Sequence, residues 1–277
     1  MSIDLHIHSN FSDGIYKPEK ITELAFKNKL KAFSLTDHDT IAGLKCAKNK
    51  ALELNIEFVP GVEISAKWQH GMLHVLGYYI NPESEILING LAEMRKKRQK
   101  RNPKIIRKLN ELGIKITLDE VKQNSNGGVT GRPDIARALV KKRYAENIRH
   151  AFSLYLDKGK SAYVEKEKML PEQACEIINK SNGIAVIAHP FTLGLEGQEL
   201  FNAVKKLKQA GFMGIEAIYP ELKIEQKNFF IDIAKQLDMF ITGGSDFHDR
   251  EKPEIYPGCV KVDYNYLKQI KNFLDVE

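Results

Sequence analysis

The periodicity of hydrophobic and polar residues changes twice along the chain. In residues 1–80, and again after Pro171, short apolar runs alternate with longer stretches whose apolar positions recur three and four residues apart. The short runs are typical of buried strands and the longer stretches of helices. This pattern predicts seven strands, at residues 3–8, 31–36, 56–60, 72–80, 183–188, 214–219 and 239–242. Strands that alternate with helices in this way predict βαβ units, a parallel sheet and the α/β class.

The middle of the chain has a different pattern. Residues 83–162 are rich in Lys, Arg, Glu and Leu at helical spacing, and strand patterns are hard to find there. A run of Asn, Ser and Gly at residues 124–128 predicts a loop inside this segment. We therefore expect residues 1–82 and 163–277 to form a catalytic domain, and residues 83–162 to form a basic helical insertion that covers it as a lid.

The positive charge of the chain is concentrated in this insertion. Residues 83–160 contain 19 Lys or Arg and 9 Asp or Glu, a net charge of +10, whereas the whole chain carries +6 and the remainder therefore about −4. A basic surface of this kind favours an anionic substrate, including a polyanion. A solvated helical face would explain most of these charges equally well.

Composition narrows the class of protein further. Hydrophobic residues make up 43% of the chain and charged residues 28%, which is ordinary for a globular protein. We find no apolar run near the roughly 20 residues that cross a bilayer, no signal-peptide pattern at the N-terminus and no CxxC pair among the three cysteines. We expect a cytoplasmic protein without membrane contact. No heptad or apolar surface patch indicates an obligate protein partner, and the oligomeric state stays open.

Six of the eight histidines share one kind of position, at or just after the end of a predicted strand. In β/α barrels the C-terminal ends of the strands converge on one face, so these residues would meet in one pocket. Three acidic residues join them, and the candidate metal ligands are His6, His8, Asp13, His38, Glu63, His74, His189, Asp246 and His248. Nine ligands exceed the four that one tetrahedral site requires, which favours a multinuclear centre.

The spacing of the ligands supports this interpretation. His6 and His8 are two residues apart on a strand, so their side chains share one face and can bind one ion. Imidazole and carboxylate together suit Zn, Mn or Fe. A lone histidine such as His74 is more often a core residue, but strand-end positions for the whole set are hard to explain structurally. His70 and His150 lie outside the pattern, and we interpret them as surface residues.

Six motifs accompany these residues in chain order: DLHIHS at 4–9, SDG at 12–14, LTDHDT at 35–40, PGVE at 60–63, AHP at 188–190 and GSDFH at 244–248. Together they resemble the PHP family, the polymerase and histidinol phosphatase superfamily. The resemblance implies a distorted (β/α)7 barrel with two or three divalent ions. The implied ligand sets are His6, His8, Glu63 and Asp246 for the first ion, Glu63, His74 and His189 for the second, and Asp13, His38 and His248 for the third.

Some relatives carry His at the position of Asp13. The added carboxylate favours a harder ion there, such as Mn²⁺ or Mg²⁺. We expect Mn²⁺ as the cofactor, with Zn²⁺, Fe²⁺ or Mg²⁺ as alternatives. The motif GRPD at residues 131–134 makes the insertion similar to that of nucleoside 3′,5′-bisphosphate phosphatases and 5′→3′ exoribonucleases acting on short RNA. Arg132 matches the position expected to contact substrate phosphate, for which a planar guanidinium is suited.

The resemblance therefore implies a phosphoesterase that acts on a nucleotide or a short RNA through a metal-activated water. The catalytic candidates are Asp246, Glu63 and Arg132, with Asp246 either orienting the nucleophile or only binding metal. Three alternatives remain open at this point. They are a histidinol-phosphate-type phosphatase, a metallohydrolase of C–N bonds, and a non-catalytic nucleic-acid-binding accessory protein.

Overall fold

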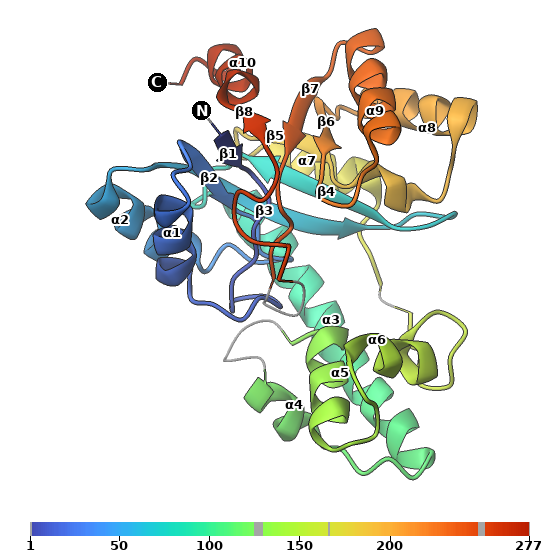
Figure 1. Cartoon of the computed structure of the whole chain (residues 1–277). Helices are drawn as coiled ribbons and strands as arrows, with labels where there is room; N and C mark the ends of the chain where they lie inside the picture. Colours follow the sequence, from blue (N-terminus) through green and yellow to red (C-terminus); the bar gives the residue numbers. More distant parts are fainter. Residues whose placement is uncertain (1, 125–129, 166, 249–252, 277) are drawn as a thin grey trace.

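An eight-stranded sheet forms the centre of the computed structural model, which describes every residue except 1, 125–129, 166, 249–252 and 277 (Figure 1). The strands are β1 (Ser2–Asp4), β2 (Ala32–Leu35), β3 (Glu57–Ala66), β4 (Leu73–Tyr78), β5 (Ile184–Ile187), β6 (Gly214–Ile218), β7 (Phe240–Gly243) and β8 (Val262–Asp263). Their order across the sheet is β7-β6-β5-β4-β3-β2-β1-β8. The segments that follow β1 and β7 in the chain form a further parallel bridge, between Ile7 and Phe247. This bridge joins the two sides of the sheet and nearly closes it into a barrel.

Helices cover the outside of this barrel. They are α1 (Pro18–Lys27), α2 (Leu44–Leu54), α7 (Pro171–Asn179), α8 (Gly197–Gln209), α9 (Ile224–Gln236) and α10 (Tyr264–Leu274). Pro18 and Pro171 each stand in the first turn of a helix, where a missing N–H removes no intrahelical hydrogen bond. The expected α/β barrel with a helical insertion is confirmed.

The direction of β4 differs from the prediction of a parallel sheet. β4 pairs antiparallel with both β3 and β5. The connection from β3 to β4 spans only residues 67–72, whereas a parallel crossover needs about a dozen residues or more. Because β4 is reversed, its first residues lie on the face where the parallel strands end, and His74 stands there. The sequence pattern also missed β8, which has two residues and is too short to show a periodicity.

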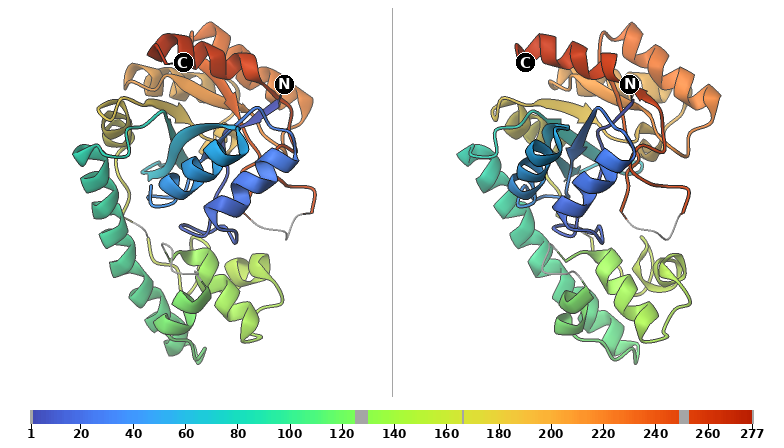
Figure 2. Two further views of the ribbon diagram at one scale, coloured as in Figure 1. Left: turned by 90° about the vertical axis from the view of Figure 1, so that its left-hand side faces the viewer. Right: turned by 60° about the vertical axis from the view of Figure 1, so that its left-hand side comes forward.

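The insertion packs around a core of its own. It contains α3 (Glu85–Glu111), α4 (Leu118–Asn124), α5 (Arg132–Lys141), α6 (Ile148–Ala151) and a π-helical turn, Phe152–Leu156. In α3, Leu87 and Leu91 belong to the barrel core, whereas Ile105 and Leu109 belong to the core of the insertion. Figure 2 shows α3 running from the barrel to the far end of the insertion. The domain boundaries stay a prediction, and the expected loop lies, apart from its first residue, outside the described residues.

Within the part of the chain that the structure describes, no helix combines the length and apolar character needed to cross a lipid bilayer.

Candidate metal centre and phosphate cavity

The structure brings all nine predicted ligands together at one end of the barrel. His6, His8 and Asp13 come from the loop after β1, His38 follows β2, Glu63 and His74 lie in β3 and β4, His189 follows β5, and Asp246 and His248 follow β7. Their ligand atoms form four overlapping groups, and within each group all atoms lie within 4.8 Å of one another. Among the described residues, His70 and His150 belong to none of these groups; His70 is exposed and His150 partly exposed.

Asp246 and Glu63 each place a carboxylate oxygen next to both His6 and His8 in this cluster. Nε2 of His6 lies 3.1 Å from Nε2 of His8, and Oδ1 of Asp246 lies 3.2 and 3.1 Å from these two nitrogens. Oε2 of Glu63 lies 3.4 and 3.3 Å from the same nitrogens. Metal–ligand bonds of about 2.1 Å place tetrahedral ligands roughly 3.4 Å apart, so this spacing is suited to one shared ion.

Glu63 faces two sides of the cluster at once. While its Oε2 points toward His6 and His8, its Oε1 lies 2.9 Å from Nδ1 of His74 and 3.1 Å from Nε2 of His189. Its side chain is 1% exposed, so its charge is not stabilised by contact with solvent. A carboxylate in this position can bridge two ions.

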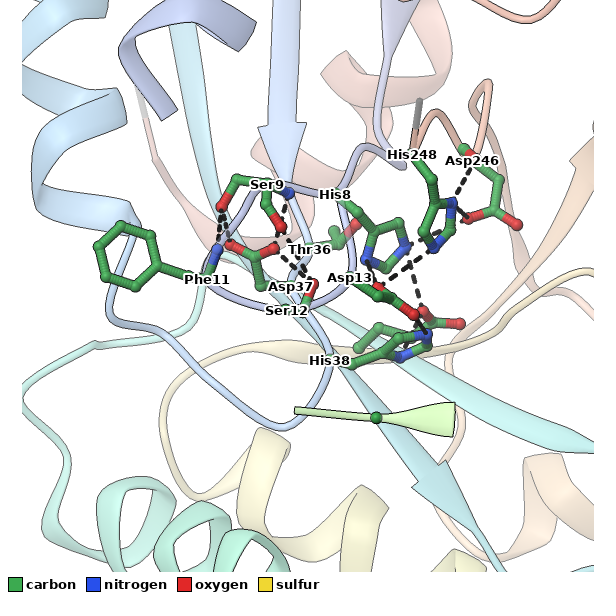
Figure 3. A network of polar contacts seen from close by, with 12 residues as sticks. His8, Ser9, Phe11, Ser12, Asp13, Thr36, Asp37, His38, Asp246 and His248 are labelled. Carbon is green, nitrogen blue, oxygen red and sulfur yellow. Dashed lines mark hydrogen bonds and ion pairs between the residues drawn. The ribbon is translucent and has the colours of Figure 1, made fainter. Parts of the chain in front are cut away.

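The third side of the cluster, around Asp13, is looser. Nε2 of His248 lies 3.3 Å from Asp13 Oδ1, whereas Nε2 of His38 lies 3.8 Å from Asp13 Oδ2. The side chains of His38 and His248 are 13% and 28% exposed, so this side is more open to solvent than the fully buried pair His6 and His8. Figure 3 shows the rings of His8, His38 and His248 turned toward Asp13.

Several atoms of the cluster need a partner that the protein does not provide. Among the described residues, Nδ1 of His8, Oδ1 of Asp13, Nδ1 of His38 and Oε2 of Glu63 are buried and make no hydrogen bond. Leaving a buried polar atom unsatisfied costs about 1–3 kcal/mol. Cations coordinated by these atoms would offset that cost, and the mixed nitrogen and oxygen donors are those that divalent first-row metals prefer. The residues present therefore fit a metal centre.

The electrostatics of the cluster keep its carboxylates ionised. Burial alone would raise the pKa of Glu63, Asp13 and Asp246, but the surrounding imidazoles outweigh it and hold all three pKa values below their usual range. Burial likewise opposes protonation of His8, yet Asp246 and Glu63 raise its pKa to about 10. Without a metal, protons would occupy this imidazole, so metal binding should release protons.

A polar network fixes the loop that carries Asp13. Buried Asp37 accepts hydrogen bonds from the Ser9 backbone N at 2.7 Å, from Ser9 Oγ at 2.6 Å and from Ser12 Oγ at 2.7 Å (Figure 3). Gly14 closes the same loop, and a Cβ there would lie 2.4 Å from the backbone oxygen of His8. These residues belong to the motifs DLHIHS, SDG and LTDHDT, but their spacing in the sequence did not indicate this role.

Arginines of the insertion face the cluster of predicted metal ligands across one cavity of about 720 Å³. Asp13, His38 and His74 line it on the barrel side, and Arg98, Arg101, Arg132 and Lys168 line it on the other. The predicted phosphate ligand Arg132 donates to the Leu156 carbonyl at 3.0 Å, and its guanidinium lies 5.6 and 5.7 Å from the ring centroids of Phe152 and Tyr163. These contacts fix the orientation of its planar head group.

Arg98 and Arg101 are among the basic residues of the insertion that a solvated helical face would explain equally well from the sequence. Both are buried, and among the described residues Nε of each makes no hydrogen bond. Burial and the charges of Arg98 and Arg132 lower the pKa of Arg101 to about 9. Cations that destabilise one another in this way would be stabilised by a bound anion. The missed signal was the spacing of three between them, which places both on one face of α3.

The barrel and its cluster of imidazoles and carboxylates define the class of an α/β-barrel metallohydrolase. The chain belongs to the PHP domain family, whose model matches residues 4–189. Among curated proteins it is 35% identical to a 5′-3′ exoribonuclease of Haemophilus influenzae, over 88% of this chain and 89% of that protein. It is 31% identical to the 3′,5′-nucleoside bisphosphate phosphatase of Chromobacterium violaceum, over 89% of this chain and 87% of that protein.

Solved structures agree with the family. A Chromobacterium violaceum protein called an amidohydrolase, with bound sulfate and no metal, superposes with a TM-score of 0.90 at 29% identity, over 99% of this chain and 96% of that one. A Bifidobacterium adolescentis protein described as a candidate metal-dependent phosphoesterase gives 0.88 at 27% identity, over 98% and 95%. The chain thus has the fold of the PHP metal-dependent phosphoesterases, and the two curated relatives named above are phosphoesterases.

Proposed function

We propose that this protein hydrolyses a phosphate ester of a nucleotide that carries a second phosphate, either a nucleoside 3′,5′-bisphosphate or the 5′ end of a short RNA. The observation that carries the proposal is the shared cavity. Its barrel side presents a cluster suited to divalent metals, and its insertion side presents buried guanidinium groups. A substrate with two phosphates would meet both sides, with the scissile phosphate at the cluster and the other at the arginines.

The names of the relatives support the substrate class. One relative is named as a phosphatase of 3′,5′-nucleoside bisphosphates and another as a 5′-3′ exoribonuclease. In this chain the second activity would use the same cavity for the 5′-terminal nucleotide of the RNA. Histidinol phosphate carries a single phosphate and an amine, so it would leave Arg101 and Arg132 without a substrate anion, whereas Arg98 is already paired with Asp39.

The residues of the chain divide the work of this reaction. We assign the nine clustered residues to two or three divalent ions, with Mn²⁺ as the favoured metal. When bound, such ions lower the pKa of water toward neutrality and offset charge on phosphoryl oxygens. Glu63 holds the two halves of the cluster together, and Asp246 orients the attacking water. Arg132 binds the second phosphate through its fixed guanidinium and so positions the scissile group.

The test is phosphate or nucleotide release by the purified protein with Mn²⁺, compared for adenosine 3′,5′-bisphosphate, a 5′-phosphorylated short RNA, histidinol phosphate and a simple amide. We expect turnover of the bisphosphate, the RNA or both, and its loss with a chelator. Preference for histidinol phosphate, hydrolysis of the amide, or salt-sensitive RNA binding without any hydrolysis would each contradict the proposal and favour a different function.

A further inference from the structure

β6 supplies none of the nine predicted ligands, yet it brings a carboxylate against them. Glu216 on this strand is fully buried, and its two oxygens contact two different residues of the cluster. Oε1 lies 2.9 Å from Nδ1 of His6, and Oε2 accepts a hydrogen bond from the backbone N of His189 at 2.7 Å. Burying an ionised carboxylate is unfavourable unless it is well paired. The packing of the core would be served better by an apolar side chain, so this acid indicates a role toward the cluster.

The contact with His6 sets which of its nitrogens carries a proton. A carboxylate can only accept, so the imidazole donates from Nδ1 to Glu216. In the neutral ring, Nε2 of His6 is then the nitrogen that can bind a metal, and it is the atom that faces His8, Asp246 and Glu63 at 3.1–3.4 Å. In metal sites, a carboxylate in this position orients the ring of the ligand and increases its basicity.

The contact with His189 acts on the backbone of a second ligand. His189 has a φ of 25°, a conformation that is unfavourable for a residue with a side chain. The hydrogen bond from its N–H to Glu216 stabilises this conformation, from which Nε2 of His189 reaches Glu63 Oε1 at 3.1 Å. One side chain therefore supports ligands on both sides of Glu63.

Tyr219, directly after β6, repeats this arrangement at a third ligand. Its hydroxyl donates to Oδ2 of Asp246 at 2.9 Å, and this leaves Oδ1 facing His6 and His8. Asp246 has a φ of 51°, so it too needs support from its surroundings.

We propose that Glu216 and Tyr219 are positioning residues of the metal centre. Glu216 fixes the Nδ1–H tautomer of His6 and the backbone of His189, and Tyr219 fixes the carboxylate of Asp246. Together they increase the affinity of the centre for divalent metal. This inference rests on the metal centre of the proposed function, but not on its substrate.

The variant Glu216→Gln keeps the size of the side chain but replaces one carboxylate oxygen with an NH₂ group. It can therefore accept a hydrogen bond from His6 or from the backbone of His189, but not from both through separate oxygens. We expect its affinity for Mn²⁺, measured by chelator competition on the metal-free protein, to fall by about 10–100-fold. The visible absorption of the Co²⁺-loaded protein should shift, because the ligand geometry changes. Glu225→Gln, which removes an exposed carboxylate from α9, is the matched control and should bind Mn²⁺ like the wild type.

Tyr219→Phe gives a second test that removes only a hydroxyl, and we expect a loss of about 10-fold in Mn²⁺ affinity. If Glu216→Gln does not fold, the Mn²⁺ affinity of Tyr219→Phe decides whether the inference holds. Wild-type affinity and an unchanged Co²⁺ spectrum in the folded variants would overturn the inference. A wild-type protein that binds no divalent metal would overturn it together with the metal centre. If the protein were inactive on every phosphoester, weaker metal binding by the variants would support the inference and contradict only the proposed function.

Discussion

The barrel and the insertion approach the same cavity with different kinds of side chain and by different structural means. On the barrel side, imidazoles and carboxylates come from strand ends and from loops fixed by buried bonds such as those of Asp37. On the insertion side, the cations come from the helices α3 and α5 and from Lys168 near the start of α7. The arginines face the cluster because α3 joins the two cores.

A few side chains connect the two regions directly. Arg98 pairs with Asp39, next to the predicted ligand His38, and Arg95 donates to the carbonyl of Asp39 at 3.0 Å. Arg137 of α5 donates to the carbonyl of Asp13 at 2.7 Å. The insertion therefore contacts the looser, third side of the cluster and leaves the first side, around His6, to the barrel. We infer that chemistry depends on the barrel and substrate affinity on the insertion.

The largest effect is expected from His6→Ala combined with His8→Ala. A single transition-state donor can contribute about 10²–10³-fold, so loss of a whole ion should reduce turnover by more than about 10³-fold. The fold should persist, which circular dichroism and the melting temperature can check. The control replaces the outlying His70 and His150 with Ala. Full activity in the His6 and His8 variant would exclude the proposed mechanism.

Arg132→Ala tests the contribution of the insertion to substrate affinity. A hydrogen bond to a charged group contributes about 1.5–3 kcal/mol, so KM for the bisphosphate should rise by about 10–100-fold. A phosphomonoester without a second phosphate should be hydrolysed nearly as well as by the wild type. Arg149→Ala, at an exposed position of α6, serves as the matched control. An equal loss on both substrates would show that Arg132 does not act through the second phosphate.

Leu139→Ala tests whether the two cores are independent. Leu139 is fully buried in the insertion core, and its truncation should destabilise that core by about 2–5 kcal/mol. Hydrogen exchange should become faster in α4, α5 and α6, with KM raised a few-fold and Mn²⁺ affinity unchanged. Leu76→Ala in β4 is the counterpart in the barrel core and should instead weaken metal binding. If hydrogen exchange became faster in the barrel and in the insertion of either variant, the two regions would unfold as one unit.

The smallest effect concerns Asp134, which joins the backbone N of Gly131 to Arg137. Burial raises its pKa from 3.8 to about 6. The folded state therefore holds this proton more tightly than the unfolded state, and the resulting stabilisation is lost as the pH rises from about 4 through 6. Asp134→Asn should remove about 1–3 kcal/mol of this pH dependence, measured by urea unfolding at pH 4 and pH 7. An identical pH profile in wild type and variant would contradict the assignment.

Residues that show a local signal could be predicted from the sequence. Most of the predicted ligands follow the ends of strands, and strand ends are visible as boundaries of apolar runs, although Glu63 lies inside β3 and His74 near the start of β4. Direction and partnership between distant segments have no such signal. The reversal of β4 follows from the short connection after β3, which the sequence concealed because the predicted strand ended at residue 60 and β3 extends to Ala66. The burial of Arg98 depends on Asp39, 59 residues away. Glu216 could not be predicted for the same reason, because its partner His6 is 210 residues distant.

The most direct test of the account is a titration of the metal-free protein with Mn²⁺, in which bound ions and phosphate release from adenosine 3′,5′-bisphosphate are measured on the same samples. We predict at least two ions per chain, with activity appearing as they bind and disappearing with a chelator. Full turnover by the metal-free protein, or by a protein that holds a single ion, would contradict a multinuclear catalytic centre.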